Sequence, residues 1–456
     1  MTPITHELIG DTCLLLLFVA VISASEFCTR KGWLAPEPAR KSVHLIGGLG
    51  CILFPFVVSS WISVLCISLV FAIVFYLGEN RNMLKSLSSV KRKSLGSFLF
   101  PVSILLLYVV SDGRLWMYIS GLLVLVLADT AAALTGTRFG RITYQTAPGQ
   151  NKSLEGSLMF TLVGFLSIVL PMFFLSEIPP VNIVLTGILM ALLLAGLEAV
   201  SIGGTDNLFV PLISCFLLLK VPDKPAVEIL FQCISLIGIA FAVFAVNRHY
   251  KTLQLRLLII FGLITYTTWS LGSADWMIPI ISLFVIYNQI CDKCAVLPHD
   301  LSALELIRPF YPQLAIIFAA NYLLTLDFWF APFIVANATA VAICIIHRFA
   351  IESVPSHPSG LRLAATAFLP AVIPLLLCIP FQGISVLHAA PAIIILCAST
   401  TLIYNRFVKL PLSGFVWNYA VPITSTTAAL AYAGIQYLEW VPIMKPTMWM
   451  DVFRCQ

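Results

Sequence analysis

Long apolar stretches separated by short polar segments dominate the pattern of this chain. In the first half they fall near residues 11–28, 43–58, 60–77, 98–111, 115–136, 155–175, 182–200 and 206–220. Further apolar runs between 226 and 435 predict roughly seven or eight more crossings, since a helix needs about 20 residues to span a bilayer. We therefore expect an all-α, polytopic transmembrane helical bundle of about 14–16 spans in two halves.

The composition supports a membrane protein. Of the 456 residues, 60% are hydrophobic and only 10% are charged, whereas a soluble domain carries about 25% charged residues. These proportions exclude a disordered chain and an ordinary soluble globule. The net charge of +5 is small and scattered in the second half. It does not form the basic stripe of a nucleic-acid-binding protein, so we expect no nucleic-acid partner.

The apolar pattern is interrupted at Lys224 to Ala226, after Pro222. This interruption predicts one membrane domain at residues 1–223 and a second at 224–456.

The twelve cysteines lie mostly inside apolar runs without regular spacing, so no disulfide framework is expected. Cys291 and Cys294 with His299 resemble half of a zinc site and lack a second pair.

Basic residues concentrate on one side of the predicted bundle. The loops at 29–42, 78–97 and 137–154 are two crossings apart, and they carry Arg30, Lys31, Arg40, Lys41, Arg81, Lys85, Lys91, Arg92, Lys93, Arg138, Arg141 and Lys152. The positive-inside rule places these loops in the cytoplasm and the N-terminus outside. Lys220 and Lys224 fall on the opposite side, so either the run at 206–220 is re-entrant or the count of spans is off by one.

Three polar clusters occupy the predicted cytoplasmic side. The first is Arg40, Lys41 and His44 at the mouth of the second span, with His44 one helical turn beyond Arg40. Cations at this depth are often only snorkelling at the membrane interface. Gly47 and Gly48 follow His44 and allow a helix or a ligand to approach the backbone closely, which favours a functional interpretation.

The second cluster begins at Asp129, near the end of an apolar span. An ionisable group at that depth is costly, so a functional role is the default hypothesis. The loop after it supplies cations, hydroxyls and glycines that suit an anion cradle at a helix start: Arg138, Gly140, Arg141, Gly149, Lys152, Ser153, Glu155, Gly156 and Ser157. Asp129 or Glu155 would hold the magnesium that accompanies a triphosphate. The spacing is not that of a Walker A motif.

The third cluster is formed by Glu198, at the end of an apolar run, and by Asp206 and Asn207, which open the next run after a glycine turn. Asp206 would also be explained by a simple helix N-cap. Two acids and an amide at one membrane boundary, on the side where Asp129 lies, more readily complete a metal and phosphate site.

Four blocks in this order resemble the dolichol kinase and phytol kinase family, which are CTP-dependent kinases of polyprenyl alcohols with a fold relationship to phosphatidate cytidylyltransferases. Each block alone is weak, but four in sequence over residues 25–220 are specific. The blocks comprise Arg40, Lys41 and His44; Arg92, Gly96 and Pro101; Asp129 to Gly140 with Lys152 to Ser157; and Glu198, Asp206, Asn207 and Pro211.

The resemblance implies transfer of the terminal phosphoryl group of CTP to the hydroxyl of an isoprenoid alcohol at the cytoplasmic face. Arg40, Lys41, Arg138, Gly140, Lys152, Ser153, Glu155, Gly156 and Ser157 would bind the nucleotide, and Asp129, Glu198, Asp206 and Asn207 would hold Mg²⁺. A carboxylate or His44 would accept the alcohol proton. A groove between spans would take the prenyl tail. The preference for CTP over ATP rests on family likeness alone.

Other function classes remain open from the sequence. A cytidylyltransferase would join CTP to an acidic lipid and release pyrophosphate, and a transporter or scaffold is a further alternative. The second half resembles no family that we recognise. Its Asp275, Asp327, Arg348 and Glu352 stand mostly beside Trp, Phe or Pro, where interfacial anchoring is the ordinary explanation. Homo-oligomerisation is possible, and an endoplasmic reticulum, plastid or bacterial inner membrane is not distinguished.

Overall fold

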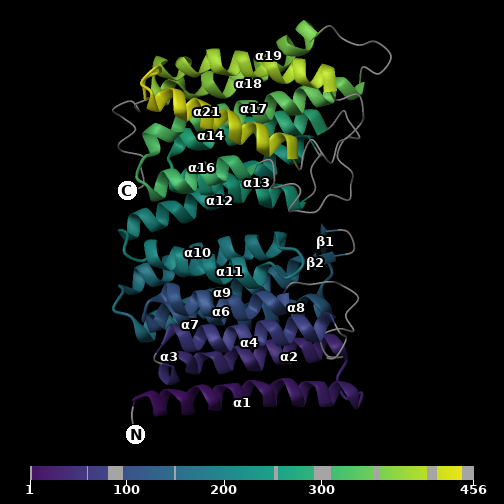
Figure 1. The fold of residues 1–456 in the computed structure, drawn as a ribbon, viewed down its shortest axis with the longest axis vertical. Helices are drawn as coiled ribbons and strands as arrows, with labels where there is room; N and C mark the ends of the chain where they lie inside the picture. The colour runs from purple at the N-terminus through teal and green to yellow at the C-terminus, as the bar shows by residue number, and fades with distance from the viewer. Residues whose placement is uncertain are drawn as a thin grey trace. The chain divides into compact units, whose positions relative to one another are not determined.

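The computed structural model describes residues 3–58, 60–80, 96–147, 150–250, 255–291, 310–352, 360–407 and 419–443. These residues are almost entirely helical, and the two strands among them form a single hairpin. The chain divides into two compact units, Met1–Ile234 and Ser235–Gln456. The all-α class is confirmed (Figure 1). Arg92, Gly149 and most of the segment with the partial zinc pattern, 292–309, lie outside the described residues.

The helices of the first unit follow the predicted apolar runs. They are α1 (Pro3–Arg30), α2 (Pro36–Gly50), η1 (Cys51–Leu53), α3 (Phe54–Val57), α4 (Trp61–Asn80), α6 (Gly96–Ser111), α7 (Leu115–Leu123), η2 (Val124–Ala128), α8 (Asp129–Phe139), α9 (Leu154–Leu175), α10 (Pro180–Val200) and α11 (Asp206–Lys220). α12 (Ala226–Tyr250) contains the division between the units. The run at 206–220, for which a re-entrant segment was an alternative, is one helix that packs on α6 and α10.

A hairpin interrupts this helical pattern. Strands β1 (Thr143–Ala147) and β2 (Gln150–Ser153) pair antiparallel, with Tyr144 opposite Lys152. The sequence indicated only a polar loop between 137 and 154. The hairpin ends where α9 begins, so it carries Lys152 directly to the start of a membrane helix.

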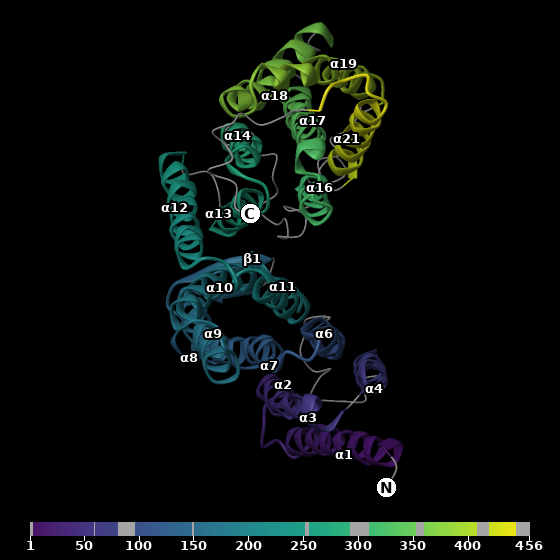
Figure 2. The ribbon, with the colours of Figure 1, turned by 90° about the vertical axis from the view of Figure 1, so that its left-hand side faces the viewer.

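The second unit is built around α17 (Leu326–Glu352). This helix contacts α14 (Ala274–Cys291), α16 (Tyr311–Tyr322), α18 (Gly360–Gln382), α19 (Ala390–Phe407) and α21 (Val421–Tyr437), while α13 (Leu255–Leu271) packs on α14 and η4 (Ile384–Ala389) joins α18 to α19 (Figure 2). Asp275 is buried at 1% exposure and accepts hydrogen bonds from Ser273 and Gln382. The interfacial-anchor interpretation is therefore wrong for Asp275, because its carboxylate is enclosed by protein.

The helices are suited to a bilayer. Seven helical segments among the described residues are long and apolar enough to cross one: Ile9–Arg30, Pro38–Val57, Leu115–Phe139, Leu154–Leu175, Pro180–Val200, Ala226–Arg248 and Leu326–Ile343. Shorter apolar helices accompany them, for example Trp61–Leu77 and Gly96–Ser111. The chain is a multi-pass integral membrane protein. The total of 14–16 crossings stays a prediction.

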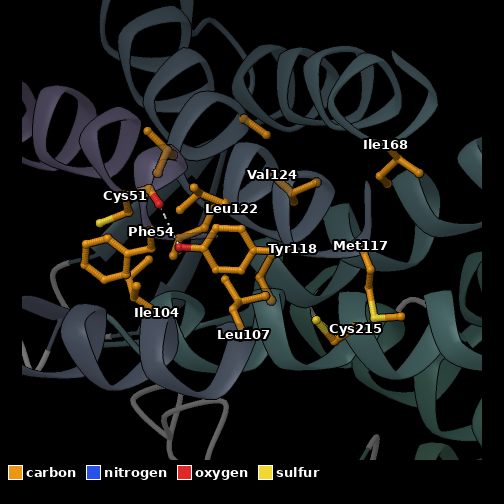
Figure 3. Packing of buried hydrophobic residues seen from close by; sticks show 14 of the residues in the cluster. Cys51, Phe54, Ile104, Leu107, Met117, Tyr118, Leu122, Val124, Ile168 and Cys215 are labelled. Atoms are coloured by element: carbon orange, nitrogen blue, oxygen red, sulfur yellow. Dashed lines mark hydrogen bonds between the residues drawn. The ribbon is translucent and has the colours of Figure 1, made fainter. Parts of the chain in front are cut away.

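The core of the first unit packs α6 and α7 against η1 and α11. Figure 3 shows Tyr118 surrounded by Phe54, Leu107 and Leu122. Its hydroxyl donates a hydrogen bond of 2.9 Å to the carbonyl of Cys51. Burial of a tyrosine is tolerated when the hydroxyl finds such a partner. The contact holds the α2–η1 junction against α7, which leads directly to Asp129.

Candidate functional site

Two ion pairs lie at one end of the first unit. In the first, the Lys41 ammonium on α2 is 2.6 Å from the Asp129 carboxylate at the start of α8. Both side chains are largely enclosed, with 14% and 17% of their surface exposed. His44 Nε2 lies 3.6 Å from the same carboxylate. Lys41 and His44 are three residues apart on one helix face, so a single turn of α2 presents both to Asp129.

A π-helical turn, η2, precedes Asp129 in the helix. Such turns are rare and occur frequently at functional sites. The Leu125 carbonyl, inside this turn, lies 3.1 Å from His44 Nε2. A carbonyl can only accept, so Nε2 donates this hydrogen bond, and in the neutral form of the ring Nδ1 is the nitrogen without a proton. The ring also contacts Phe100 at 4.7 Å between centroids.

The second ion pair joins β2 to α10. Lys152 Nζ lies 2.7 Å from Glu198 Oε1 and 3.0 Å from Ser201 Oγ, and it also donates to the Glu198 carbonyl. Burial lowers the pKa of Lys152, but the carboxylates of Glu198 and Asp206 outweigh this, and the net pKa is raised. Lys152 therefore stays a cation at neutral pH.

The two ion pairs are neighbours. α8 packs on the first turn of α9, where a Cβ on Gly156 would lie 2.9 Å from the Ala132 carbonyl. This close approach brings Lys152, just before α9, near α8, and its charge acts on both Asp129 and Asp206. Residues from α2, α8, β2, α10 and α11 thus converge at one end of the unit.

Asp206 occupies the first turn of α11, and the N-cap position belongs to Thr205. The explanation of Asp206 as the helix N-cap is therefore wrong. Its carboxylate is half-buried and is not at salt-bridge distance from the cations in the described part of the chain. It remains available to a ligand beside Lys152.

Several residues of the predicted anion cradle form hydrogen bonds that stabilise the hairpin and the start of α9. Ser153 is the N-cap of α9, and its hydroxyl accepts from the Gly156 amide at 3.1 Å. The Glu155 carboxylate accepts from the backbone amides of Arg141 and Ile142 at 3.0 and 3.2 Å. Glu155 is therefore committed to the base of the hairpin, and it does not join the ion pairs.

The remaining loop residues have different surroundings. Ser157 Oγ is 2.7 Å from the Tyr144 hydroxyl. Arg138 is exposed and lies over the Phe139 ring at 5.3 Å. A Cβ on Gly140 would meet the Gly136 carbonyl at 2.3 Å, so this position excludes a side chain. Nucleotide contacts by these residues stay predictions.

Asn207 has a structural task. Its side-chain amide donates to the Gly96 carbonyl at 2.9 Å, and its own carbonyl accepts from Ser103. These hydrogen bonds hold the first turn of α11 against the start of α6. A metal-binding role for Asn207 stays a prediction, and it would fall to the side-chain amide oxygen, because the amide nitrogen donates to α6.

The acidic side chains here suit a magnesium ion that binds together with a nucleotide. They do not suit a metal site built from protein ligands alone. Among the described residues, no group of three or more His, Cys, Asp or Glu side chains stands close enough to hold a metal ion. Asp129 and Asp206 still offer two carboxylates at the converging end. Mg²⁺ commonly takes one or two protein carboxylates and completes its shell with substrate phosphates and water.

An apolar pocket adjoins the first ion pair. It lies between α1, α2, α4 and α6, and the space between its lining residues, open solvent included, is about 750 Å³. Arg40 and His44 line it from α2, and Asn207 lines it from α11. Arg40, predicted to contact the nucleotide, thus stands beside the pocket and close to His44.

Three residues of this region were not singled out from the sequence. Ser201 binds Lys152, the Leu125 carbonyl orients His44, and Phe100 packs on the His44 ring. Ser201 stood within the EAVSIGGTDN block and could have been found as a polar residue beside Glu198. The other two had no signal, because a backbone carbonyl and an apolar ring look ordinary in a membrane span.

The chain is similar to a curated kinase of an isoprenoid alcohol. A phytol kinase of Synechocystis sp. is 35% identical to the chain over 197 residues, which are 42% of this chain and 83% of the relative. No protein-family model matches the chain. No solved structure matches it either.

Proposed function

Because the chain belongs to the phytol kinase family, we propose that it transfers the terminal phosphoryl group of CTP to the hydroxyl of an isoprenoid alcohol. The observation that carries the proposal is the family relationship. The convergence of two ion pairs beside an apolar pocket supports it. A polar site for phosphates and an apolar site for a prenyl tail are what such a reaction has to bring together.

The polar side of the site suits a triphosphate. Phosphoryl transfer depends mainly on positioning and on cations around the phosphates. Lys41 and Lys152 are held by Asp129 and Glu198, and phosphate oxygens would compete for both ammonium groups. Mg²⁺, held by Asp129 and Asp206, would neutralise charge on the phosphates. Arg138 is exposed at the end of α8 and would contact the nucleotide.

The acceptor side involves His44. In the proposed reaction the alcohol oxygen forms a bond to the γ-phosphorus, the bond from that phosphorus to the bridging oxygen breaks, and CDP leaves. His44 lines the pocket, and because Nε2 donates to the Leu125 carbonyl, Nδ1 is the nitrogen that can act as a base when the ring is neutral. Nδ1 accepts the hydroxyl proton, while the Leu125 carbonyl holds the ring in place.

The proposal is tested with purified full-length protein in detergent, magnesium, a panel of prenyl alcohols and γ-labelled CTP or ATP. We expect label in an organic-soluble product, with CTP as the better donor, and loss of the product when EDTA removes magnesium. A nucleotidyl transfer would release the γ-phosphate in pyrophosphate, and the lipid would stay unlabelled. That result, or no product with any alcohol, would contradict the proposal.

A further inference from the structure

The apolar pocket has a polar end and an apolar end. Arg40 and His44 lie early in α2, Gly96 and Ser97 begin α6, and Asn207 lies in the first turn of α11. All of these face the end of the unit where the ion pairs lie. From there the lining is mostly aromatic and aliphatic, with Phe18, Ile22, Phe54, Ile67 and Ile104 among its residues, and the buried Ser68 adds a hydroxyl beside Ile67.

The path from the polar end to the apolar end can be followed along α6. Gly96 and Ile104 both line the pocket, and eight residues of helix correspond to about 12 Å. The order of residues on α2 agrees, because His44 is followed at greater depth by Gly47 and Cys51. The pocket therefore runs along the helices, away from the ion pairs and into the apolar interior.

An aromatic cluster forms the far end. The Phe18 ring packs edge-on against Phe54 at 5.9 Å and against Phe71 at 5.4 Å between centroids. One turn further from the polar end, Leu14 and Val64 are buried and do not line the pocket. The pocket is closed at this floor, which we define as Phe18, Phe54 and Phe71.

We propose that the hydrocarbon tail of the isoprenoid alcohol enters this pocket end-on from its polar end, and that the Phe18 floor sets the longest tail accepted. The inference rests on the proposed function. A pocket that is closed at its far end limits the length of the tail that enters it. A path of roughly 12 Å along α6 suits a tail of diterpenoid length, such as that of phytol or geranylgeraniol, better than that of a dolichol-length polyprenol, which is several times longer.

The test measures chain-length preference with the full-length protein. Transfer from labelled CTP is compared for geraniol, farnesol, geranylgeraniol, phytol and a dolichol-length polyprenol. We expect wild-type kcat/KM to rise to the diterpenoids and to fall for the long polyprenol. Phe18→Ala should raise kcat/KM for the long polyprenol relative to geranylgeraniol by about tenfold, since apolar pockets discriminate added methylenes on this scale. Phe18→Leu covers the case in which the alanine variant does not fold.

A larger side chain in the pocket should shorten the longest tail that is accepted. Ile67 is buried at the far end and lines the pocket, so Ile67→Phe should lower kcat/KM for geranylgeraniol about tenfold while farnesol is still phosphorylated. Phe174→Ala is the matched control, because Phe174 is 73% exposed on α9, away from the pocket. Unchanged preference in Phe18→Leu and Ile67→Phe, with active enzyme, would overturn the inference and leave the kinase intact.

A second measurement separates the inference from the kinase activity. A geranylgeraniol analogue with a photoreactive group at the tail end is crosslinked to the purified protein, and the labelled peptides are identified. We expect crosslinks in peptides that contain Phe18 or Ile67, suppressed by excess phytol. Such crosslinks without any phosphoryl transfer would refute the proposed function and retain the pocket. Crosslinks elsewhere, or crosslinks that phytol does not suppress, would refute the pocket.

Discussion

At the scale of single residues, the site consists of charges that compensate one another. Lys41 and Asp129 form one largely enclosed pair, and Lys152 and Glu198 form another. Removing one partner of such a pair leaves an uncompensated charge, which costs about 3–5 kcal/mol. For each variant, both the rate of phosphoryl transfer and the thermal stability therefore have to be measured.

Asp129→Asn keeps the size of the side chain and removes its charge. We expect transfer to fall by about 10²-fold or more, the scale of a lost electrostatic contact in a transition state. The variant should also lose stability, because Lys41 is left without its partner, so transfer is measured below the midpoint of its thermal unfolding, where it elutes as a single folded species. Asp112→Asn is the matched control. Asp112 lies in an exposed turn with a positive φ of 45°, which asparagine adopts readily. Near-normal transfer by Asp129→Asn would remove Asp129 from the site.

Lys152 can be tested with a double substitution. Lys152→Met alone should lower both thermal stability and transfer, because Glu198 is left buried without its cation. Lys152→Met combined with Glu198→Gln should recover much of the stability, since no charge remains, and should still fail to transfer phosphate. Thermal unfolding and the γ-label assay measure the two effects. Lys224→Met is the control, because Lys224 forms a similarly enclosed pair with Glu228 beyond the end of α11, away from Asp206. It should lower thermal stability and leave transfer unchanged. Recovery of transfer in the double variant would contradict the role of Lys152.

At the scale of elements, the site depends on how α8 and α9 meet. The first turn of α9 approaches α8 so closely that Gly156 has no room for a side chain against the Ala132 carbonyl. The hairpin β1–β2 then determines the position of Lys152. Glu155, in the first turn of α9, accepts a hydrogen bond from the Arg141 amide at the base of this hairpin. The two ion pairs are neighbours because these elements hold their backbones together.

Gly156→Ala should therefore separate the two ion pairs. Its Cβ would lie 2.9 Å from backbone, and we expect a destabilisation of about 1–3 kcal/mol, as in other overpacked contacts, together with a drop in transfer. Gly164→Ala is a matched control in the same helix, because its nearest contact would be an ordinary 3.8 Å to the Phe160 ring. This control should be neutral or slightly stabilising. Thermal unfolding and the label assay distinguish the two variants, and equal behaviour would contradict the packing argument.

At the scale of the whole molecule, all residues of the two ion pairs and of the apolar pocket lie in the first unit, Met1–Ile234. The aligned region of the Synechocystis phytol kinase is 197 residues long, fewer than this unit contains. The second unit buries polar side chains of its own, with Asn337 on α17 donating to the Pro279 carbonyl at 2.9 Å. Its helices are organised around α17.

The orientation in the membrane is a property of the whole chain. The basic loops predict that the hairpin side faces the cytoplasm. In a version of the protein without its native cysteines, Arg141→Cys should react with an impermeant maleimide only after intact cells are permeabilised, and Glu177→Cys, in the loop between α9 and α10, should react before. Labelling is read by mass shift. The reverse pattern would place the site on the outer face.

The amino-acid sequence by itself determined the class of this protein. Long apolar runs with few charges have to become membrane helices, because lipid leaves backbone groups no other partner. It also singled out Asp129 and Glu198 as candidate site residues, since ionisable residues stand out against an apolar background, and Lys152 as a cation of the polar loop before a membrane span. Only the tertiary structure decided that Lys41 pairs with Asp129, 88 residues away, and Lys152 with Glu198. Such pairs depend on which helix ends meet, and side-chain packing between helices sets this. The same packing encloses the pocket, which has no counterpart in any single stretch of the chain.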